Sequence, residues 1–210
     1  MARKRQYHHG NLKEVLLASA VKLVSEVGPQ AFTLREVARR AGVSHNAPYR
    51  HFRDKQDLLG AVAEQGFDLL TASMREAMSQ GRNAEERLYL AGRGYVQFAL
   101  RWPQHIQVMF DLPTVKEPSA SASTAGRRAF QTLLDAVVAV QAAGGLPAGD
   151  PLPLAVVAWS GVHGLAKLAI SGRLPLAANQ TVEFTRYLTR ALFAGISNLP
   201  HPSLPSQKRQ

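Results

Sequence analysis

The sequence predicts an all-α protein of about nine helices, in which a small N-terminal helix-turn-helix domain precedes a larger helical domain. Apolar residues recur every three or four positions along most of the chain, and Gly or Pro ends most of these stretches. No segment alternates apolar and polar residues over the length of a strand, so no sheet is expected. A chain of 210 residues is long enough to form both cores.

The helix-turn-helix prediction starts with two helices and the turn that follows them. A first helix is predicted over Asn11–Val27, before a Gly-Pro stop signal. Thr33 and Glu36 stand three residues apart before an apolar pattern, which predicts a capping box at the start of a short second helix. Gly42 is expected to end that helix, because the residue after a helix often needs a positive φ.

A third helix is predicted over about His45–Phe52, with Ser44 as its N-cap. Its exposed positions carry residue types that suit a DNA duplex. Asn pairs with adenine, Arg pairs with guanine, and Ala packs against a thymine methyl group. Tyr and Lys suit phosphate oxygens. On spacing alone, an ordinary helical hairpin with a solvated polar face is the alternative.

Positive charge is concentrated in the same part of the chain. Residues 1–60 hold eleven Lys or Arg against five Asp or Glu, a net of +6 out of the total of +10. Such a basic region attracts a polyanion and gives salt-dependent binding. The segment Arg3-Lys4-Arg5 precedes the first helix. It is either an arm that contacts phosphates or a minor groove, or a solubilising terminus.

Taken together, these features of the first sixty positions resemble the TetR family of bacterial transcriptional regulators. Four segments follow one another in the order of that family's DNA-binding domain: the first helix, Phe32-Thr33-Leu34, Ala47–Phe52 and Asp54-Lys55. Ser44 joins the candidate DNA-binding set as the predicted cap. The resemblance implies phosphate contacts at Thr33, Tyr49 and Lys55, and base contacts at Arg35, His45, Asn46, Ala47, Arg50 and His51.

Pro48 departs from the Leu that is commoner at this position of the family. A proline within the first helical turn lacks only an N–H group that would be unpaired in any case. We therefore expect an altered start to the recognition helix, and not its loss.

Six further helical segments are predicted beyond this region. They cover Asp54–Gln80, Glu85–Trp102, Gln104–Phe110, Ala129–Ala143, Asp150–Gly172 and Asn179–Ile196. Asp150-Pro151 is expected to supply an N-cap and first helical residue, and Asn179 to cap the last helix. Lys116–Gly126 is either a loop or the frayed start of a helix. The expected divisions are a DNA-binding domain at 1–55, a ligand-binding and dimerisation domain at 56–198, and a flexible tail at 199–210.

Trp159, His163 and Gly164 resemble the signature of a TetR branch that is named for Trp-His-Gly. Trp159 and His163 stand four residues apart, so they share a helix face. His163 either contacts an effector or is satisfied in the core by a backbone carbonyl, and the second interpretation is preferred. No second His or carboxylate stands at a matching turn, so neither a metal site nor a cofactor is predicted.

The resemblance also implies a homodimer, formed through the last two helices, and a small-molecule pocket. Apolar residues on those helices suggest a partner; they include Val156, Val157, Leu165, Leu168, Phe184, Leu188, Leu192 and Phe193. A dimer would place two recognition helices in successive major grooves of a palindromic operator in double-stranded DNA. Candidate pocket residues are Phe67, Met74, Tyr95, Phe98, Trp102, Met109, Phe110, Phe130, Trp159 and His163, which suggest an apolar or aromatic effector.

The expected function is therefore a sequence-specific regulator, by family default a repressor, which an effector releases from its operator. A non-specific architectural DNA-binding protein and a basic membrane-surface protein are the alternatives. An enzyme is not expected, because the sequence contains no GxSxG, Walker A, HExxH or GxGxxG motif.

The expected compartment is the cytoplasm. The sequence has no cysteine, and its basic N-terminus lacks a hydrophobic signal core. The apolar run Leu152–Ile170 is interrupted by Pro, Ser, His and Lys, so we expect a buried interface helix there and no membrane span.

Overall fold

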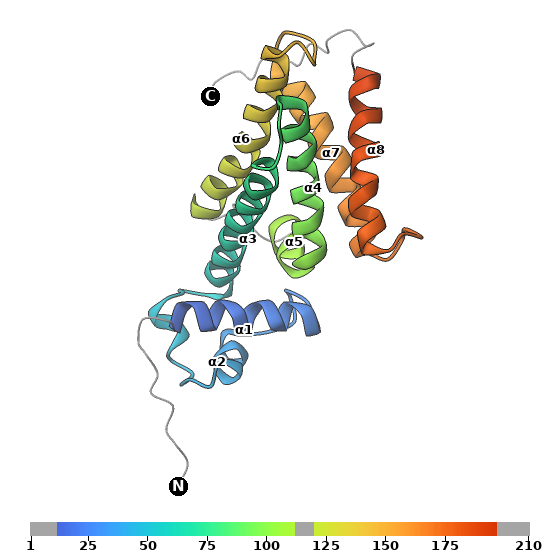
Figure 1. The fold of residues 1–210 in the computed structure, drawn as a ribbon. Coiled ribbons are helices and arrows are strands. Elements are labelled where there is room, and N and C mark those ends of the chain that lie inside the picture. The colour runs from blue at the N-terminus through green and yellow to red at the C-terminus, as the bar shows by residue number, and fades with distance from the viewer. Residues whose placement is uncertain (1–11, 112–119, 197–210) are drawn as a thin grey trace. The chain divides into compact units, whose positions relative to one another are not determined.

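The computed structural model describes residues 12–111 and 120–196 (Figure 1). Over these residues the chain forms eight α-helices and one short 3₁₀-helix and no strand, which confirms the all-α class. Eight of the nine predicted helices are α-helical, and the ninth is the 3₁₀-helix. The elements are α1 Leu12–Val27, α2 Leu34–Ala41, η1 Pro48–Arg50, α3 Lys55–Met78, α4 Ala84–Arg101, α5 Pro103–Phe110, α6 Ala120–Ala142, α7 Pro151–Ile170 and α8 Ala178–Ile196.

The helices form two compact units, which we describe separately. The first unit contains the described residues up to 66 together with 104–111 and 120–125. The second contains 67–103 and the described residues from 126 onward. The predicted tail and the Arg3-Lys4-Arg5 segment lie outside the described residues, so the structure adds nothing to either prediction.

The core of the first unit joins α1, α2 and the start of α3. Leu16, Val37, Leu58 and Val62 have no exposed surface, and Phe52 brings the segment after η1 into the same cluster. Full burial of an aliphatic side chain stabilises a fold by roughly 1.5–3 kcal/mol. These contacts therefore fix α2 on α1 and α3, and they leave the polar side of α2 in solvent.

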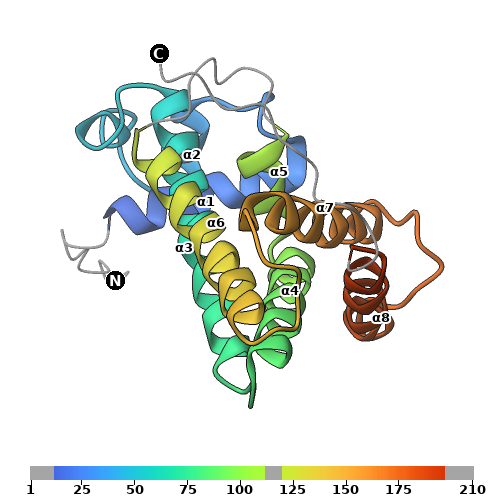
Figure 2. The same ribbon diagram turned by 90° about the horizontal axis from the view of Figure 1, so that it is seen from above.

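In the second unit, α4 packs against both α7 and α8, which also pack against each other (Figure 2). Small residues permit these contacts. A Cβ added to Gly92 of α4 would lie 3.2 Å from Val162 Cγ1 and 3.5 Å from Thr185 Cγ2. A Cβ added to Gly161 of α7 would lie 2.5 Å from Leu192 Cδ1 of α8. Helices α4, α7 and α8 therefore approach one another closely at Gly92 and Gly161.

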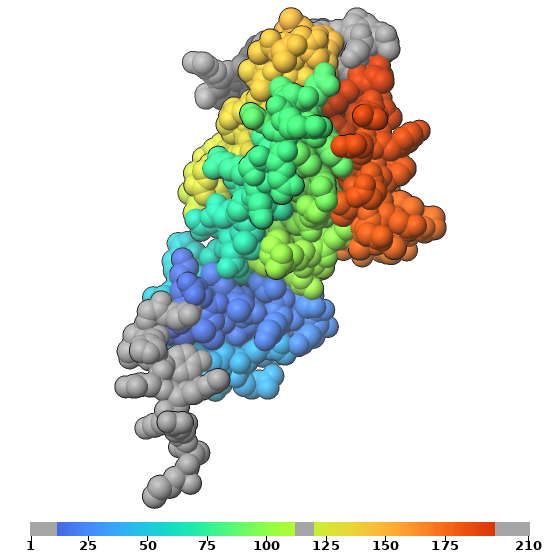
Figure 3. Space-filling view, in the orientation of Figure 1, coloured from blue at the N-terminus to red at the C-terminus, as the bar shows by residue number. Residues whose placement is uncertain are grey.

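Helix α8 buries three threonines within the second unit. Thr181, Thr185 and Thr189 are buried, and each hydroxyl donates to the carbonyl four residues earlier, at 2.8–3.3 Å. These bonds satisfy the hydroxyl groups and leave the methyl groups to pack. Phe184 is 39% exposed, and α8 runs uncovered along the surface of the second unit (Figure 3).

Two predicted helix starts need correction. Helix α6 begins at Ala120, nine residues before Ala129 and inside the stretch Lys116–Gly126, for which the sequence allows either a loop or a helix start; buried Ala122 and Ala125 give its first turns a packed face. Asn179 lies inside α8 and does not cap it; the N–H of Ala177 is bonded instead by the Gln180 side chain at 2.8 Å. Helix α4 ends at Arg101, and α5 begins at Pro103, one residue before the predicted Gln104.

The N-terminus of α7 follows the prediction. The carboxylate of Asp150 accepts the N–H of Leu152 at 2.9 Å, and Pro151 is the first helical residue. By length and composition alone, α7 is the one described helix that could cross a membrane. Part of this apolar surface is buried against α4 and α8.

We predict that Gly94→Ala destabilises the protein. A Cβ at this position of α4 would lie 2.6 Å from the Ser73 carbonyl oxygen and 2.9 Å from Met74 Cα, so backbone atoms of α3 would have to move. Overpacking of this kind costs roughly 1–3 kcal/mol. Urea denaturation measures the loss, and Gly195→Ala, which meets nothing within 4 Å, is the control. Equal stability of the two variants would contradict the backbone contact.

Candidate nucleic-acid interface

The N-terminus of α2 is fixed by the predicted capping box. The Thr33 N–H donates to Glu36 Oε2 at 2.7 Å, and the Glu36 N–H donates to Thr33 Oγ1 at 3.3 Å. The Thr33 hydroxyl also donates to the same carboxylate at 2.9 Å. These hydrogen bonds lower the pKa of Glu36. Both residues remain in solvent, so the cap defines where the exposed side of α2 begins.

The other end of α2 closes with the αL glycine that the sequence predicted. Gly42 has φ 70°, its N–H donates to the Arg39 carbonyl at 3.2 Å, and the Val43 N–H donates to the Ala38 carbonyl at 3.0 Å. This is a Schellman motif, and it satisfies two carbonyls at the helix end. The turn that follows is therefore set by Gly42.

An ion pair holds α2 to the end of α1. Both terminal nitrogens of Arg40 bond the Glu26 carboxylate, one of them at 2.6 Å, and this pairing lowers the pKa of Glu26. Arg40 is thereby committed within the protein. Arg35 and Arg39, on the same helix, are exposed and remain the cations that α2 can offer to a ligand.

The predicted recognition helix His45–Phe52 is not an α-helix, and this corrects the expectation that Pro48 would alter only its start. The Ala47 N–H donates to the Ser44 carbonyl at 2.9 Å, and η1 covers only Pro48–Arg50. Pro48 has no N–H to give to the Ser44 carbonyl, and in an α-helix its ring would clash with that carbonyl. A turn and a 3₁₀-helix therefore replace the predicted helix, and Ser44 caps neither by its side chain.

Most of the predicted DNA contacts nevertheless lie on the surface. The exposed residues are Thr33, Arg35, Ser44, His45, Asn46, Tyr49, Arg50 and His51. Ala47 is only 8% exposed, so it packs inward with Pro48. Lys55 is partly buried: its Nζ donates to the Gln30 carbonyl at 2.8 Å and lies 5.2 Å from the centre of the Phe32 ring.

Two exposed arginines were not assigned from the sequence. Arg39 lies on the solvent side of α2. The side chain of Arg53 is 89% exposed, and its Nε lies 3.6 Å from the Asp57 carboxylate at the start of α3. In the sequence, Arg39 stands next to Arg40, and Arg53 stands two residues before the predicted phosphate contact Lys55. These positions could have suggested both residues. With them, the exposed segment 33–53 carries four uncommitted or weakly paired arginines.

The ten predicted pocket residues do not form one site. Met109 and Phe110 belong to the first unit, and the others belong to the second. Four of those others form an aromatic cluster: Tyr95 Oη lies 2.7 Å from His163 Nδ1, and Trp159 packs edge-on against both His163 and Phe130. Burial raises the pKa of Tyr95. His163 is therefore bonded to the phenol hydroxyl of Tyr95 in the second unit.

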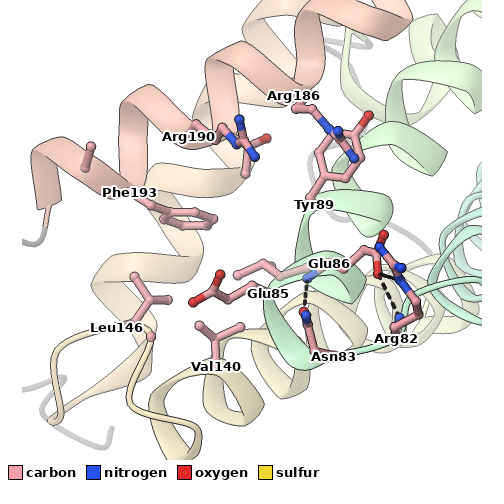
Figure 4. A pocket seen from close by; sticks show the side chains of 14 residues that line it. Arg82, Asn83, Glu85, Glu86, Tyr89, Val140, Leu146, Arg186, Arg190 and Phe193 are labelled. Carbon is pink, nitrogen blue, oxygen red and sulfur yellow. Dashed lines mark hydrogen bonds and ion pairs between the residues drawn. The ribbon is translucent and has the colours of Figure 1, made fainter.

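Two cavities lie elsewhere in the second unit. One, of about 490 Å³, lies between the start of α4, the end of α6 and α8, and none of the ten predicted residues lines it (Figure 4). The other, of about 600 Å³, lies between α3 and α4 and is lined by Phe98 and Trp102 of the predicted set. No group of three or more His, Asp or Glu among the described residues is placed to hold a metal ion.

Comparison with known families assigns both ends of the chain. Residues 16–62 match the bacterial regulatory proteins of the tetR family, and residues 88–192 match the tetracyclin repressor-like C-terminal domain. The chain belongs to the TetR family. It is thus a DNA-binding transcriptional regulator and not an enzyme, as the sequence predicted.

Individual relatives agree with the family assignment over parts of their length. The transcriptional activator FasR of Mycolicibacterium smegmatis is 30% identical over 122 residues, which is 58% of this chain and 55% of FasR. The class C tetracycline repressor of Escherichia coli is 40% identical over 52 residues, 25% of this chain and 24% of the repressor. The chain thus matches about half of FasR and a quarter of the repressor.

Two solved structures share most of the fold. A protein of unknown function from Rhodococcus sp. RHA1 is 35% identical with a TM-score of 0.81, over 93% of this chain and all of that one. The TetR family regulator PfmR from Thermus thermophilus has a TM-score of 0.68 at 16% identity, covering 85% and 97% of the two chains. The second likeness is one of fold alone.

We predict that Asn46→Ala weakens binding to a preferred duplex by about 1–3 kcal/mol and weakens binding to random duplex much less. The reason is that Asn46 is exposed on the turn before η1 and can pair with an adenine edge. Titration of both duplexes at two salt concentrations measures the difference. Asn179→Ala, the same substitution at an exposed position of α8, is the control. An equal loss on both duplexes would remove Asn46 from the base-reading set.

Proposed function

We propose that this regulator binds a palindromic operator as a homodimer in the cytoplasm, and that it represses transcription until a small molecule releases it. The observation that carries the proposal is the exposed polar segment between α2 and α3. His45 and Asn46 are exposed on the turn, and Tyr49 and Arg50 are exposed on η1. The Schellman motif precedes this segment, and buried Phe52 follows it.

The roles of these residues follow from their chemistry and exposure. Arg35, His45, Asn46, Arg50 and His51 are the proposed base-reading side chains. Thr33, Tyr49 and Lys55 are the proposed phosphate contacts, and Lys55 keeps two ammonium hydrogens for this purpose after bonding Gln30. Arg39 and Arg53 add phosphate contacts to this set, and buried Ala47 is left out of it.

The proposed dimer forms through α7 and α8. Of the nine exposed large apolar side chains in the described residues, six lie on these two helices: Leu152, Val156, Val157, Leu168, Phe184 and Tyr187. Such a concentration of apolar surface favours a partner. Gly164 lies on the same line of α7 as Val157 and Leu168, and a Cβ added there meets nothing within 4 Å. A second helix could therefore approach α7 closely at this glycine.

Dimerisation supplies the geometry that operator recognition needs. Two copies related by a two-fold axis present two identical reading segments, and half-sites in successive major grooves lie about 34–36 Å apart. An effector that binds better to a form with a different separation of these segments would release the DNA. The two cavities of the second unit are candidate sites for it, and Trp159, His163 and Gly164 support assignment to the Trp-His-Gly branch.

Selection of genomic DNA fragments by the purified protein tests the proposal. Recovery of a palindrome with half-sites about one helical turn apart would support a sequence-specific dimer. Equal affinity for selected and random duplex would indicate architectural binding instead. A reporter placed behind the recovered site then gives the direction of control. Repression predicts higher expression when the regulator is deleted, whereas a FasR-like activator would give lower expression.

We predict that Phe184→Glu converts the dimer to a monomer. The side chain is 39% exposed on α8, so a carboxylate there would be solvated in the monomer and desolvated in the dimer. Sedimentation velocity should show a dimer dissociation constant raised at least about tenfold, which corresponds to ~1.4 kcal/mol.

Val138→Glu is the matched control, because Val138 is 46% exposed on α6, away from the proposed interface. Gly164→Leu gives an independent check, since the larger side chain has open space in one chain and none against a close partner helix. A dimer that tolerates both Phe184→Glu and Gly164→Leu would contradict an interface made by α7 and α8.

A further inference from the structure

The cavity of about 490 Å³ combines charged walls with an apolar floor (Figure 4). Its walls come from the first turns of α4, from the end of α6 with the following loop, and from the second half of α8. All of these belong to the second unit. Its volume lies within the range of roughly 300–1,000 Å³ that is typical of small-molecule sites.

The cations of the cavity are not equally available. Arg82 is engaged by Glu86, to which its Nε donates at 3.2 Å and its backbone N–H at 2.9 Å. Arg186 lies over the Tyr89 ring, 4.8 Å from its centre. Among the described residues, the Arg190 side chain has neither a hydrogen bond nor an ion pair. It is therefore the guanidinium that can give both of its N–H edges to a ligand.

The acidic residues of the cavity differ in the same way. Glu86 is held by Arg82, and its backbone N–H donates to Asn83 Oδ1 at 2.8 Å. The Glu85 carboxylate makes no hydrogen bond or ion pair within the described part of the chain, and it points into the space between Val140, Leu146 and Phe193 (Figure 4). Gly145 provides that space, since a Cβ there would lie 2.6 Å from Glu85 Oε1.

The floor of the cavity is part of the hydrophobic core. Leu88, Val140 and Leu146 are at most 6% exposed, and Phe193 packs on the same cluster. The Phe193 ring faces the cavity from α8 (Figure 4). A ligand with only charged groups would leave this apolar surface unused, and a purely apolar one would leave Arg190 and Glu85 without partners.

We propose that this cavity binds a small organic acid that has an aromatic or other apolar body and a hydrogen-bond donor. Its carboxylate pairs with Arg190, with Arg186 beside it, in the bidentate geometry that guanidinium groups favour. Its body lies against Phe193 and Leu146, and its amino or hydroxyl group donates to Glu85. This inference rests on the proposed function, because it gives the effector a site and a chemical class.

The position of the cavity on α8 explains how such a ligand would act on the dimer. Successive residues of an α-helix are about 100° apart, so Arg190 and Phe184 lie about 120° apart around α8. The ligand therefore contacts one face of α8 while another face stays free for the second copy. By joining α8 to α4 and to the loop after α6, it would favour one orientation of α8 in the dimer.

Fluorescence titration of the full chain with 2-aminobenzoate tests the site, because this probe has a carboxylate, an aromatic ring and an amino donor. We expect saturable binding to the natural sequence. Neutral 2-aminobenzamide should bind the natural sequence at least about tenfold more weakly than 2-aminobenzoate does. Arg190→Gln should bind 2-aminobenzoate more weakly by the same factor. A loss of this size corresponds to one charge-assisted hydrogen bond. Arg173→Gln, an exposed arginine of the same unit outside the cavity, should bind as the natural sequence does.

The absence of saturable binding up to about 1 mM, which is a very weak interaction, would overturn the proposal. So would equal binding by Arg190→Gln or equal binding of the amide. Circular dichroism checks that the Arg190→Gln variant folds. We expect it to fold, because the Arg190 side chain makes no hydrogen bond or ion pair within the described residues. Glu85→Gln gives a second, independent variant, which should also bind 2-aminobenzoate more weakly.

Operator binding without ligand separates this inference from the proposed function. Arg190→Gln should keep the operator affinity and the dimer of the natural sequence and lose only the response to 2-aminobenzoate. Normal operator binding with no ligand response refutes the site alone. Ligand binding by a protein that recognises no operator refutes the proposed function and leaves the site.

Discussion

Close approach of backbones around α4 is the constraint on which the second unit depends. At Gly94 the backbone of α4 touches α3, where the Ser73 hydroxyl also donates to the Gly94 carbonyl at 2.9 Å. Two residues earlier, Gly92 admits Val162 of α7 and Thr185 of α8. Helix α4 is thus fixed on both sides by steric contact rather than by charge. The cavity and the aromatic cluster at Tyr95 are both built on this helix.

The sequence predicts the first unit well because its signals are local. Thr33, Glu36 and Gly42 define both ends of α2 by hydrogen bonds within a few residues, and such bonds need no knowledge of tertiary packing. Pro48 shows the limit of this reasoning. The sequence argument assumed that the N–H missing from Pro48 would have no partner in the first helical turn. In the structure the Ser44 carbonyl accepts the Ala47 N–H instead, and the chain continues as η1. One donor is enough to decide between two helix types in so short a segment.

The candidate sites of the second unit could be predicted less well, because they depend on which face each helix turns inward. Aromatic residues were natural pocket candidates, yet Tyr95 and Trp159 pack on His163, and Phe130 packs on Trp159. In α8 the buried face consists of threonines, whose hydroxyls bond the preceding turn. The sequence pattern does not show that these hydroxyl groups are hydrogen-bonded and buried. It therefore could not tell which face of α8 is exposed, and Phe184 was grouped with the other apolar residues of the helix.

Burial of threonines on α8 has a consequence for the whole second unit. Small side chains on the inward face allow α4 and α7 to pack closely, and the larger residues of α8 are distributed over the remaining surface. Phe184 and Tyr187 occupy one part of that surface, and Arg186, Arg190 and Phe193 occupy another. A single helix thus contributes to a core, to an apolar outer face and to a charged cavity. If α8 moves as a rigid element, a change in its orientation at one of these surfaces also changes its position at the other two.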